Sequence, residues 1–206
     1  MEEKIILDKI HKATQNVNEI VKEEIFTLPY FDATNFSKNI KTLQKVLLDE
    51  YITYNGNPLS LALYNSYNNT IYISKQMFNK SLARTILHEL IHMFSTDRDN
   101  NIIGYACGEN LRMFNEAATQ WLALKVFNGS NIKDNDNYIE SVILFDQLVN
   151  KYGEEKMYFG FFKADFNLFI NKFDEGEKKE ILSYIDKMNE FNICDTLKLD
   201  KENKTK

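Results

Sequence analysis

Apolar residues recur at helical spacing along most of the chain, which predicts a mostly helical protein. Between residues 4 and 25 they fall every three to four positions, the pattern of an amphipathic helix. Asp32 or Thr34 can cap a second helix, whose apolar face would extend to Leu47. A third helix should begin near Asn79 or Ser81 and carry the segment LARTILHELIHMF.

The second half of the chain continues the helical pattern. One helix is expected from about Glu109 to Phe127, and the polar segment NGSNIKDNDN that follows reads as a loop. Helical spacing resumes at Tyr138 and continues to about Phe191, with breaks expected near Gly153, Asp165 and Glu175. This region is rich in aromatic residues, which we assign to the core, with a hydrophobic substrate pocket as the alternative: Phe159, Phe161, Phe162, Phe166, Phe169 and Phe173.

One segment has strand character. The run LSLALYNSYNNTIYIS, residues 59–74, places two short apolar stretches on either side of the polar NSYNN. We therefore expect an α+β fold that is mostly helical, with a short antiparallel sheet over the helix that contains HELIH and with TIYIS near the sheet's edge. The whole chain, 1–206, should form a single domain with an upper lobe at about 1–95 and a lower lobe at about 96–200.

Composition narrows the class of protein. Hydrophobic residues make up 44% of the chain and charged residues 27%, so a buried core is expected. The net charge is −5, and no cluster of lysine and arginine is interleaved with aromatics, so we expect no nucleic-acid partner. The chain has 22 lysines and 24 asparagines but only 3 arginines, a bias typical of AT-rich coding DNA that suggests a bacterial source.

The N-terminal segment does not have the pattern of a signal peptide. The N-terminus alternates charged and apolar residues, and no run is long enough to span a membrane. The expectation is a cytoplasmic protein, although a secreted protein whose signal had been removed would have the same pattern. Cys107 and Cys194 are the only cysteines, so a disulfide framework is excluded and two free thiols are expected. The oligomeric state stays open.

Two histidines lie four residues apart in HELIH, and a glutamate follows the first of them. On a helix, His88 and His92 would project from one face, so both imidazoles can bind one ion. Glu89 would lie beside a metal-bound water, whose pKa zinc brings toward neutrality, and could accept its proton. An ordinary polar stripe is the alternative, but two of the chain's three histidines fall in this pattern. We predict one zinc ion per chain, with Glu89 as general base.

A third ligand should come from farther along the chain, where the acidic candidates are Asp97, Asp99, Glu109 and Glu116. The two aspartates follow the helix too closely for the chain to turn back. Glu109 lies at an expected helix start, where a carboxylate interacts favourably with the helix dipole. Glu116 comes 24 residues after His92, which leaves room for a loop and an antiparallel return. Glu116 is therefore the preferred ligand.

The neighbours of Glu116 support this choice. Ala117 and Ala118 would let two helices approach closely, and Thr119 and Gln120 lie about one turn farther on, on the same face. Either polar side chain could hydrogen-bond the second ring nitrogen of a ligating histidine, the support that metal sites require. The remaining histidine, His11, lies on the first expected helix and is assigned to its surface.

The segments HELIH (88–92) and NEAATQWLA (115–123) resemble the gluzincin metallopeptidases, the thermolysin-like clan, in which HExxH is followed by a glutamate on the next main helix. The resemblance covers about residues 70–127. It implies a zincin-like fold, His88, His92 and Glu116 as metal ligands, and Glu89 as general base. One position departs from the pattern: many members have an aspartate one turn after the ligand glutamate, whereas this chain has Gln120, a neutral amide that polarises the histidine less.

A group that stabilises the tetrahedral oxyanion is also needed, and clan members use a tyrosine or a histidine. With no spare histidine well placed, the candidates are Tyr105, between the two ligand helices, and Tyr138, at the start of the next helix. Tyr138 is preferred because a residue at a helix start beyond the ligand helix resembles the clan's arrangement.

These observations lead to a functional expectation. The chain should be a zinc-dependent peptidase that acts on a peptide or protein substrate. A cytosolic regulatory metallopeptidase of the kind that cleaves phage repressors is an alternative within the same chemistry. A catalytically weak metal-binding module that binds partners is the non-enzymatic alternative, and Gln120 is the feature that favours it.

Overall fold

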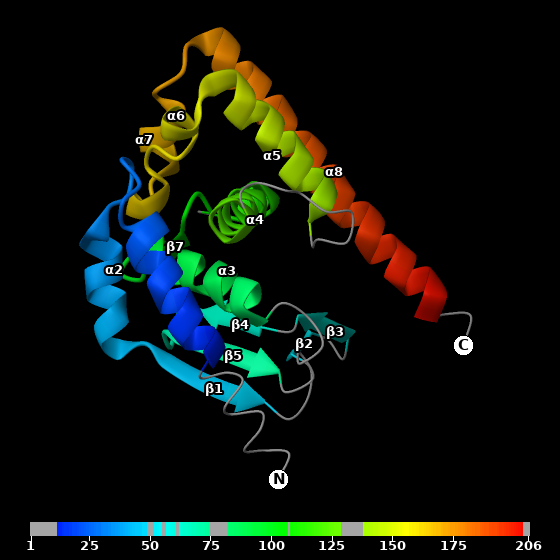
Figure 1. Cartoon of the computed structure of the whole chain (residues 1–206). Coiled ribbons are helices and arrows are strands. Elements are labelled where there is room, and N and C mark those ends of the chain that lie inside the picture. The colour runs from blue at the N-terminus through cyan, green and yellow to red at the C-terminus, as the bar shows by residue number, and fades with distance from the viewer. Residues whose placement is uncertain are drawn as a thin grey trace.

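The structure is a computed structural model that describes residues 12–48, 52–54, 57–60, 62–74, 82–106, 108–128 and 138–203. Most of the described residues are helical and a few short strands form small sheets, so the predicted α+β class is confirmed (Figure 1). The cysteine Cys107 and the expected loop at 129–137 lie outside the described residues.

The N-terminal segment begins with helical residues 12–20, which continue into a π-helical turn, η1 (Val21–Ile25). Residues 1–11 of the first expected helix lie outside the described residues. The side chain of Asp32 caps α2 (Ala33–Asn39) by accepting the N–H of Thr34 at 2.9 Å, as the sequence predicted.

The second helix is shorter than expected. It passes through η2 (Ile40–Thr42) into strand β1 (Gln44–Leu48), so the extension to Leu47 was wrong. The reason is tertiary: β1 pairs with β5 (Thr70–Ser74), and this pairing outweighs a local spacing that suits a helix.

The main sheet has three strands in the order β1–β5–β4, with β4 at Ala62–Asn65. Strands β4 and β5 pair antiparallel, as predicted for the two apolar stretches, but β1 runs parallel to β5, so the sheet is mixed. The segment TIYIS forms β5 and lies in the centre, which corrects its expected place near the edge. Two small antiparallel pairs complete the strands: β2 (Ile52–Tyr54) with β3 (Asn57–Ser60), and β6 (Thr96–Asp97) with β7 (Ile102–Ile103).

The helices stack above the sheet in successive layers. Helix α3 (Leu82–Phe94) packs on β4 and is followed by α4 (Arg112–Asn128), which is preceded by the short turn η4 (Glu109–Leu111). Helix α4 in turn packs against the pair α5 (Ile139–Tyr152) and α8 (Glu175–Asn203), which lie side by side in Figure 1. The two helices that carry the candidate ligands are therefore interior layers.

The expected breaks in the C-terminal half are present. Gly153 has φ +84° between α5 and α6 (Glu154–Met157), and the Asp165 side chain accepts the Leu168 N–H at 2.8 Å at the start of α7 (Phe166–Ile170). The turn η5 (Phe161–Lys163) lies between α6 and α7. No described helix has both the length and the apolar character needed to cross a membrane.

The lower part of the core is aromatic. Tyr105 packs against Phe114, Phe161 and Phe169, with ring centroids 4.7–5.3 Å apart. Most of the C-terminal phenylalanines are buried, which confirms their assignment to the core; Phe159 and Phe166 are only partly buried. This packing fixes α4 against the segments that follow it.

Candidate metal centre

Helix α3 carries His88, Glu89 and His92, and its two histidines contact α4. All three side chains are buried, with residue exposures of 6–8%. An amphipathic helix with a solvated polar stripe would leave these groups in water, so that alternative does not describe α3. Buried ionisable groups need partners; those of the two histidines come from α4, and that of Glu89 comes from β4.

Glu116 of α4 supplies the carboxylate. Its Oε2 lies 3.3 Å from Nε2 of His88 and 3.4 Å from Nε2 of His92, and the two Nε2 atoms are 3.0 Å apart. The Glu116 side chain is 17% exposed, so it is not an ordinary solvated helix residue. Among the described residues, this is the one group of three or more potential metal ligands whose donor atoms lie within 4.8 Å of one another.

These spacings fit a zinc ion. Ligand atoms placed tetrahedrally about 2.0–2.1 Å from zinc lie roughly 3.3 Å from one another, close to the three separations between the donor atoms. Two imidazole nitrogens that face each other at 3.0 Å also need a proton or a cation between them. With three protein ligands, a fourth coordination position would remain for water or substrate.

The second ring nitrogens of both histidines have partners on α4. Nδ1 of His88 lies 2.9 Å from Oε1 of Gln120, and Nδ1 of His92 lies 3.4 Å from Oγ1 of Thr119. Because an amide oxygen can only accept, the proton of His88 is on Nδ1, and Nε2 keeps its lone pair toward the centre. The two supporting residues proposed from sequence are thus both in place, with Gln120 making the shorter contact.

The electrostatics of the triad reflect three mutually stabilising groups. Burial lowers the pKa of His88, but the hydrogen bond to Glu116 and the charges of Glu89 and Glu116 outweigh it, so the net shift is upward. Burial raises the pKa of Glu116, but the charge of His92 and the hydrogen bonds to both histidines dominate and depress it strongly. Glu116 therefore stays ionised, the form in which a carboxylate binds a metal.

Glu89 is held at the edge of the sheet. Its Oε2 accepts the backbone N–H of Tyr64 at 2.7 Å. Tyr64 belongs to β4, whose other side pairs with β5, so this N–H lies on the free edge of the described sheet. The candidate general base thus lies between the metal ligands and an edge strand, a relation that the sequence did not reveal.

The two tyrosines considered for oxyanion stabilisation have different surroundings. Tyr105 is fully buried, and its hydroxyl donates to the carbonyl of Met157, so it has a structural role. Tyr138 is 37% exposed at the start of α5, with φ 60°. The charge of Glu116, burial and the charge of Glu89 raise the pKa of Tyr138, and a hydrogen bond to Glu116 adds to the effect. Its hydroxyl therefore stays protonated beside the centre.

The loop between the ligand helices is anchored by Asn115, which precedes Glu116. Oδ1 of Asn115 accepts the backbone N–H of Tyr105 at 3.1 Å. Gly104 has φ +56°, and a Cβ there would lie 2.1 Å from the same oxygen, so only glycine fits. Ala117 and Ala118 are fully buried on α4.

The two aspartates considered as ligands have structural contacts instead. Oδ1 of Asp97 accepts the backbone N–H groups of Asp99 and Asn100, and Asp99 pairs with Lys38 at 3.2 Å. Glu109 begins η4, as expected of a residue at a helix start. His11 lies outside the described residues.

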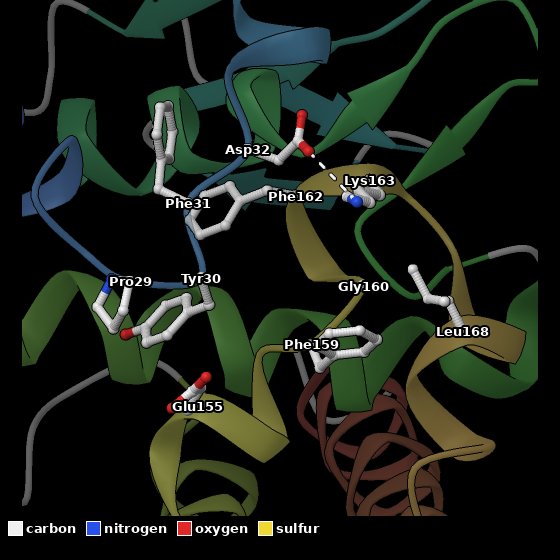
Figure 2. A pocket seen from close by; sticks show the side chains of 10 residues that line it. All are labelled: Pro29, Tyr30, Phe31, Asp32, Glu155, Phe159, Gly160, Phe162, Lys163 and Leu168. Atoms are coloured by element: carbon white, nitrogen blue, oxygen red, sulfur yellow. Dashed lines mark ion pairs between the residues drawn. The ribbon is translucent and has the colours of Figure 1, made fainter.

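A separate cavity of about 230 Å³ lies between the N-terminal segment and the η5 region. Figure 2 shows its aromatic walls, which include Tyr30 and Phe162, and the ion pair between Asp32 and Lys163 at 3.5 Å. None of the candidate metal ligands lines this cavity. Part of the C-terminal aromatic stretch therefore does line a pocket, but not one that opens on the candidate centre.

Comparison with known proteins gives one partial match. The model of a family described as a protein of unknown function (DUF1492) matches residues 116–203, less than half of the chain. The match begins at Glu116 and does not include the α3 segment that carries HELIH. No curated protein and no solved structure matches the chain.

Proposed function

We propose that this protein is a zinc-dependent peptidase of the gluzincin type. The observation that carries the proposal is the convergence of His88, His92 and Glu116 at zinc-ligand spacing, with Glu89 buried beside them. A structural zinc site has four protein ligands, whereas a catalytic site has three and an open position. Three ligands next to a potential general base favour catalysis.

Each residue near the centre would have its own role in hydrolysis. When bound, zinc would supply a Lewis acid and lower the pKa of water at the open position. Glu89 would accept the proton of that water and pass it to the leaving amine. Tyr138, kept protonated by its acidic surroundings, would donate a hydrogen bond to the developing oxyanion. Gln120 would hold the His88 ring in the tautomer that binds metal.

The substrate would bind as an extended strand along β4. An edge strand offers unpaired backbone groups to which a peptide can add, and β4 is the sheet edge that contacts Glu89. The expected substrate is therefore a polypeptide. The Tyr64 N–H, now held by Glu89, would become available when the carboxylate turns to the reacting water.

The test combines metal analysis with hydrolysis. Purified protein should contain one zinc per chain by elemental analysis, and His88→Ala should lose it. Zinc-loaded protein should cleave a casein-derived peptide mixture, as followed by mass spectrometry. Glu89→Gln should keep the zinc and lose hydrolysis, because the ligands remain while the base is gone.

Each outcome has a distinct meaning. Unchanged zinc in His88→Ala would refute the metal centre. Wild-type hydrolysis by Glu89→Gln would refute the mechanism. Zinc binding without hydrolysis of any peptide would favour the non-enzymatic metal-binding module, for which the neutral Gln120 is the structural reason.

A further inference from the structure

Arg112 lies one turn before the ligand Glu116 on α4. Residues four apart on a helix share a face, with Cβ atoms about 5–6 Å apart, so Arg112 adjoins the ligand along the surface of α4. The Arg112 side chain is exposed. Its positive charge is among the causes that act on the pKa of Tyr138, which it lowers. Arg112 is therefore an exposed cation one turn from the ligand Glu116, on the same face of α4.

Arg112 has no evident structural task. Arg98, by contrast, donates hydrogen bonds to the backbone carbonyls of Ser66 and Tyr67 and so ties two loops together. No described carboxylate forms an ion pair with Arg112. The chain uses lysine at 22 of its 25 Lys and Arg positions, so the planar guanidinium is rare in it. A guanidinium differs from an ammonium chiefly in its ability to bind a carboxylate with two parallel hydrogen bonds.

The sum of the charges around the zinc-bound site would favour binding of an anion. A zinc ion would carry +2, and the carboxylates of Glu89 and Glu116 would offset it. The exposed cation of Arg112 would then add positive charge one turn from the ligand Glu116, where it would attract a negative group on the substrate.

We propose that Arg112 is a specificity-determining residue that binds a carboxylate of the substrate, so that peptides with a carboxylate close to the scissile bond are preferred. The carboxylate can be a free C-terminus or the side chain of an aspartate or glutamate. This inference rests on the proposed function for its meaning in catalysis, but the binding site itself can be tested without hydrolysis.

The binding experiment uses zinc-loaded Glu89→Gln protein, in which the probe is not consumed. The first probe pair is dansylated tetraalanine with a free C-terminal carboxylate and the same peptide as its amide. The second pair is an acetylated and amidated alanine hexapeptide, dansylated on an added lysine, with either glutamate or glutamine at its third position. Fluorescence anisotropy gives Kd for each probe, and the pair that shows a preference identifies the source of the carboxylate.

We expect the charged member of at least one pair to bind about tenfold more tightly, because charge-assisted hydrogen bonds are stronger than neutral ones but are weakened where the guanidinium is exposed to water. Adding Arg112→Gln should remove the preference, and Arg112→Lys should keep only part of it. Lys179→Gln, which removes the same charge from an exposed position on α8, should leave the preference unchanged. Circular dichroism and zinc content of each variant show whether the fold and metal are intact.

Equal binding of both members of both pairs would overturn the inference, as would a preference that survives in Arg112→Gln. Hydrolysis by the protein with Glu89 intact separates this outcome from failure of the proposed function. Peptide cleavage with no preference for carboxylates would leave the peptidase standing without this subsite. Carboxylate binding that depends on Arg112, in a protein that cleaves no peptide, would leave the subsite standing without the peptidase.

Discussion

The orientation of His88 depends on one amide oxygen. Oε1 of Gln120 accepts from Nδ1, which leaves Nε2 free to bind a metal. A carboxylate at this position would do the same and would also make the ring more basic. The site therefore keeps the geometric part of a carboxylate–histidine pair without its charge.

The effect of the Gln120–His88 contact on zinc affinity can be compared with that of the longer Thr119–His92 contact. Gln120→Ala should reduce zinc affinity by about ten- to a hundredfold, the usual effect of losing such a partner. Thr119→Val, a change of nearly equal volume, should reduce zinc affinity less than Gln120→Ala does. The Oγ1 of Thr119 lies 3.4 Å from Nδ1 of His92, which makes this the weaker hydrogen bond. Competition with a chromophoric chelator measures both. Unchanged affinity in Gln120→Ala would mean that the amide does not orient the ring.

The two tyrosines provide a second residue-scale comparison. Tyr138→Phe should lower kcat of peptide cleavage by about ten- to a thousandfold with little change in KM, since the lost hydrogen bond would form chiefly in the transition state. Tyr105→Phe should instead lower the melting temperature and leave kcat per folded molecule near wild type, because its hydroxyl bonds the backbone of Met157. A lower kcat in Tyr105→Phe together with an unchanged kcat in Tyr138→Phe would assign the oxyanion hydrogen bond to Tyr105 instead.

At the scale of elements, the sequence was most informative where side-chain spacing and local caps decide the structure. The helix of HELIH, the helix of Glu116 and the breaks near Gly153 and Asp165 are all where periodicity placed them. Strand β1 was missed because its conformation depends on pairing with β5, more than 20 residues away. Because β1 was not predicted, TIYIS was expected at the edge of the sheet, whereas β1 covers that side and makes β5 the central strand.

Strand β4 should determine how substrate length affects cleavage. A peptide that adds to its edge gains backbone hydrogen bonds at alternate residues, so kcat/KM should rise by roughly a hundredfold or more from dipeptides to hexapeptides. N-methylation of the substrate should be harmful at every second residue only. Cleavage rates for a series of singly methylated hexapeptides test this. Equal rates along the series, or activity on dipeptides alone, would contradict strand addition.

At the scale of the whole molecule, the candidate site exists only where separate layers meet. The sequence supplied His88, His92 and Glu116, because their residue types and spacing carry the chemistry. It could not supply the Tyr64 N–H, because a backbone group leaves no signature in side-chain pattern. It also gave no reason to single out Arg112.

The aromatic core should make the protein sensitive to alkali. Burial raises the pKa of Tyr64 to about 12, and burial raises the pKa values of Tyr105 and Tyr158 well above their usual range. In the unfolded chain a tyrosine ionises near pH 10. Above about pH 10 the folded state therefore binds more protons than the unfolded state, so the free energy of unfolding falls as pH rises.

The expected titration has two phases. Tyrosines outside the core should ionise first, near the pH of about 10 that is usual for a solvated phenol, with no change in the helical circular dichroism. The buried tyrosines should ionise together at higher pH, in a step that coincides with loss of helix. Absorbance at 295 nm and ellipticity at 222 nm, recorded on the same samples, follow the two events. In Tyr158→Phe, the change in absorbance at 295 nm during the cooperative transition should be smaller by the contribution of one tyrosine. A single smooth transition near pH 10 with helix intact would show that these hydroxyls are not held in the core.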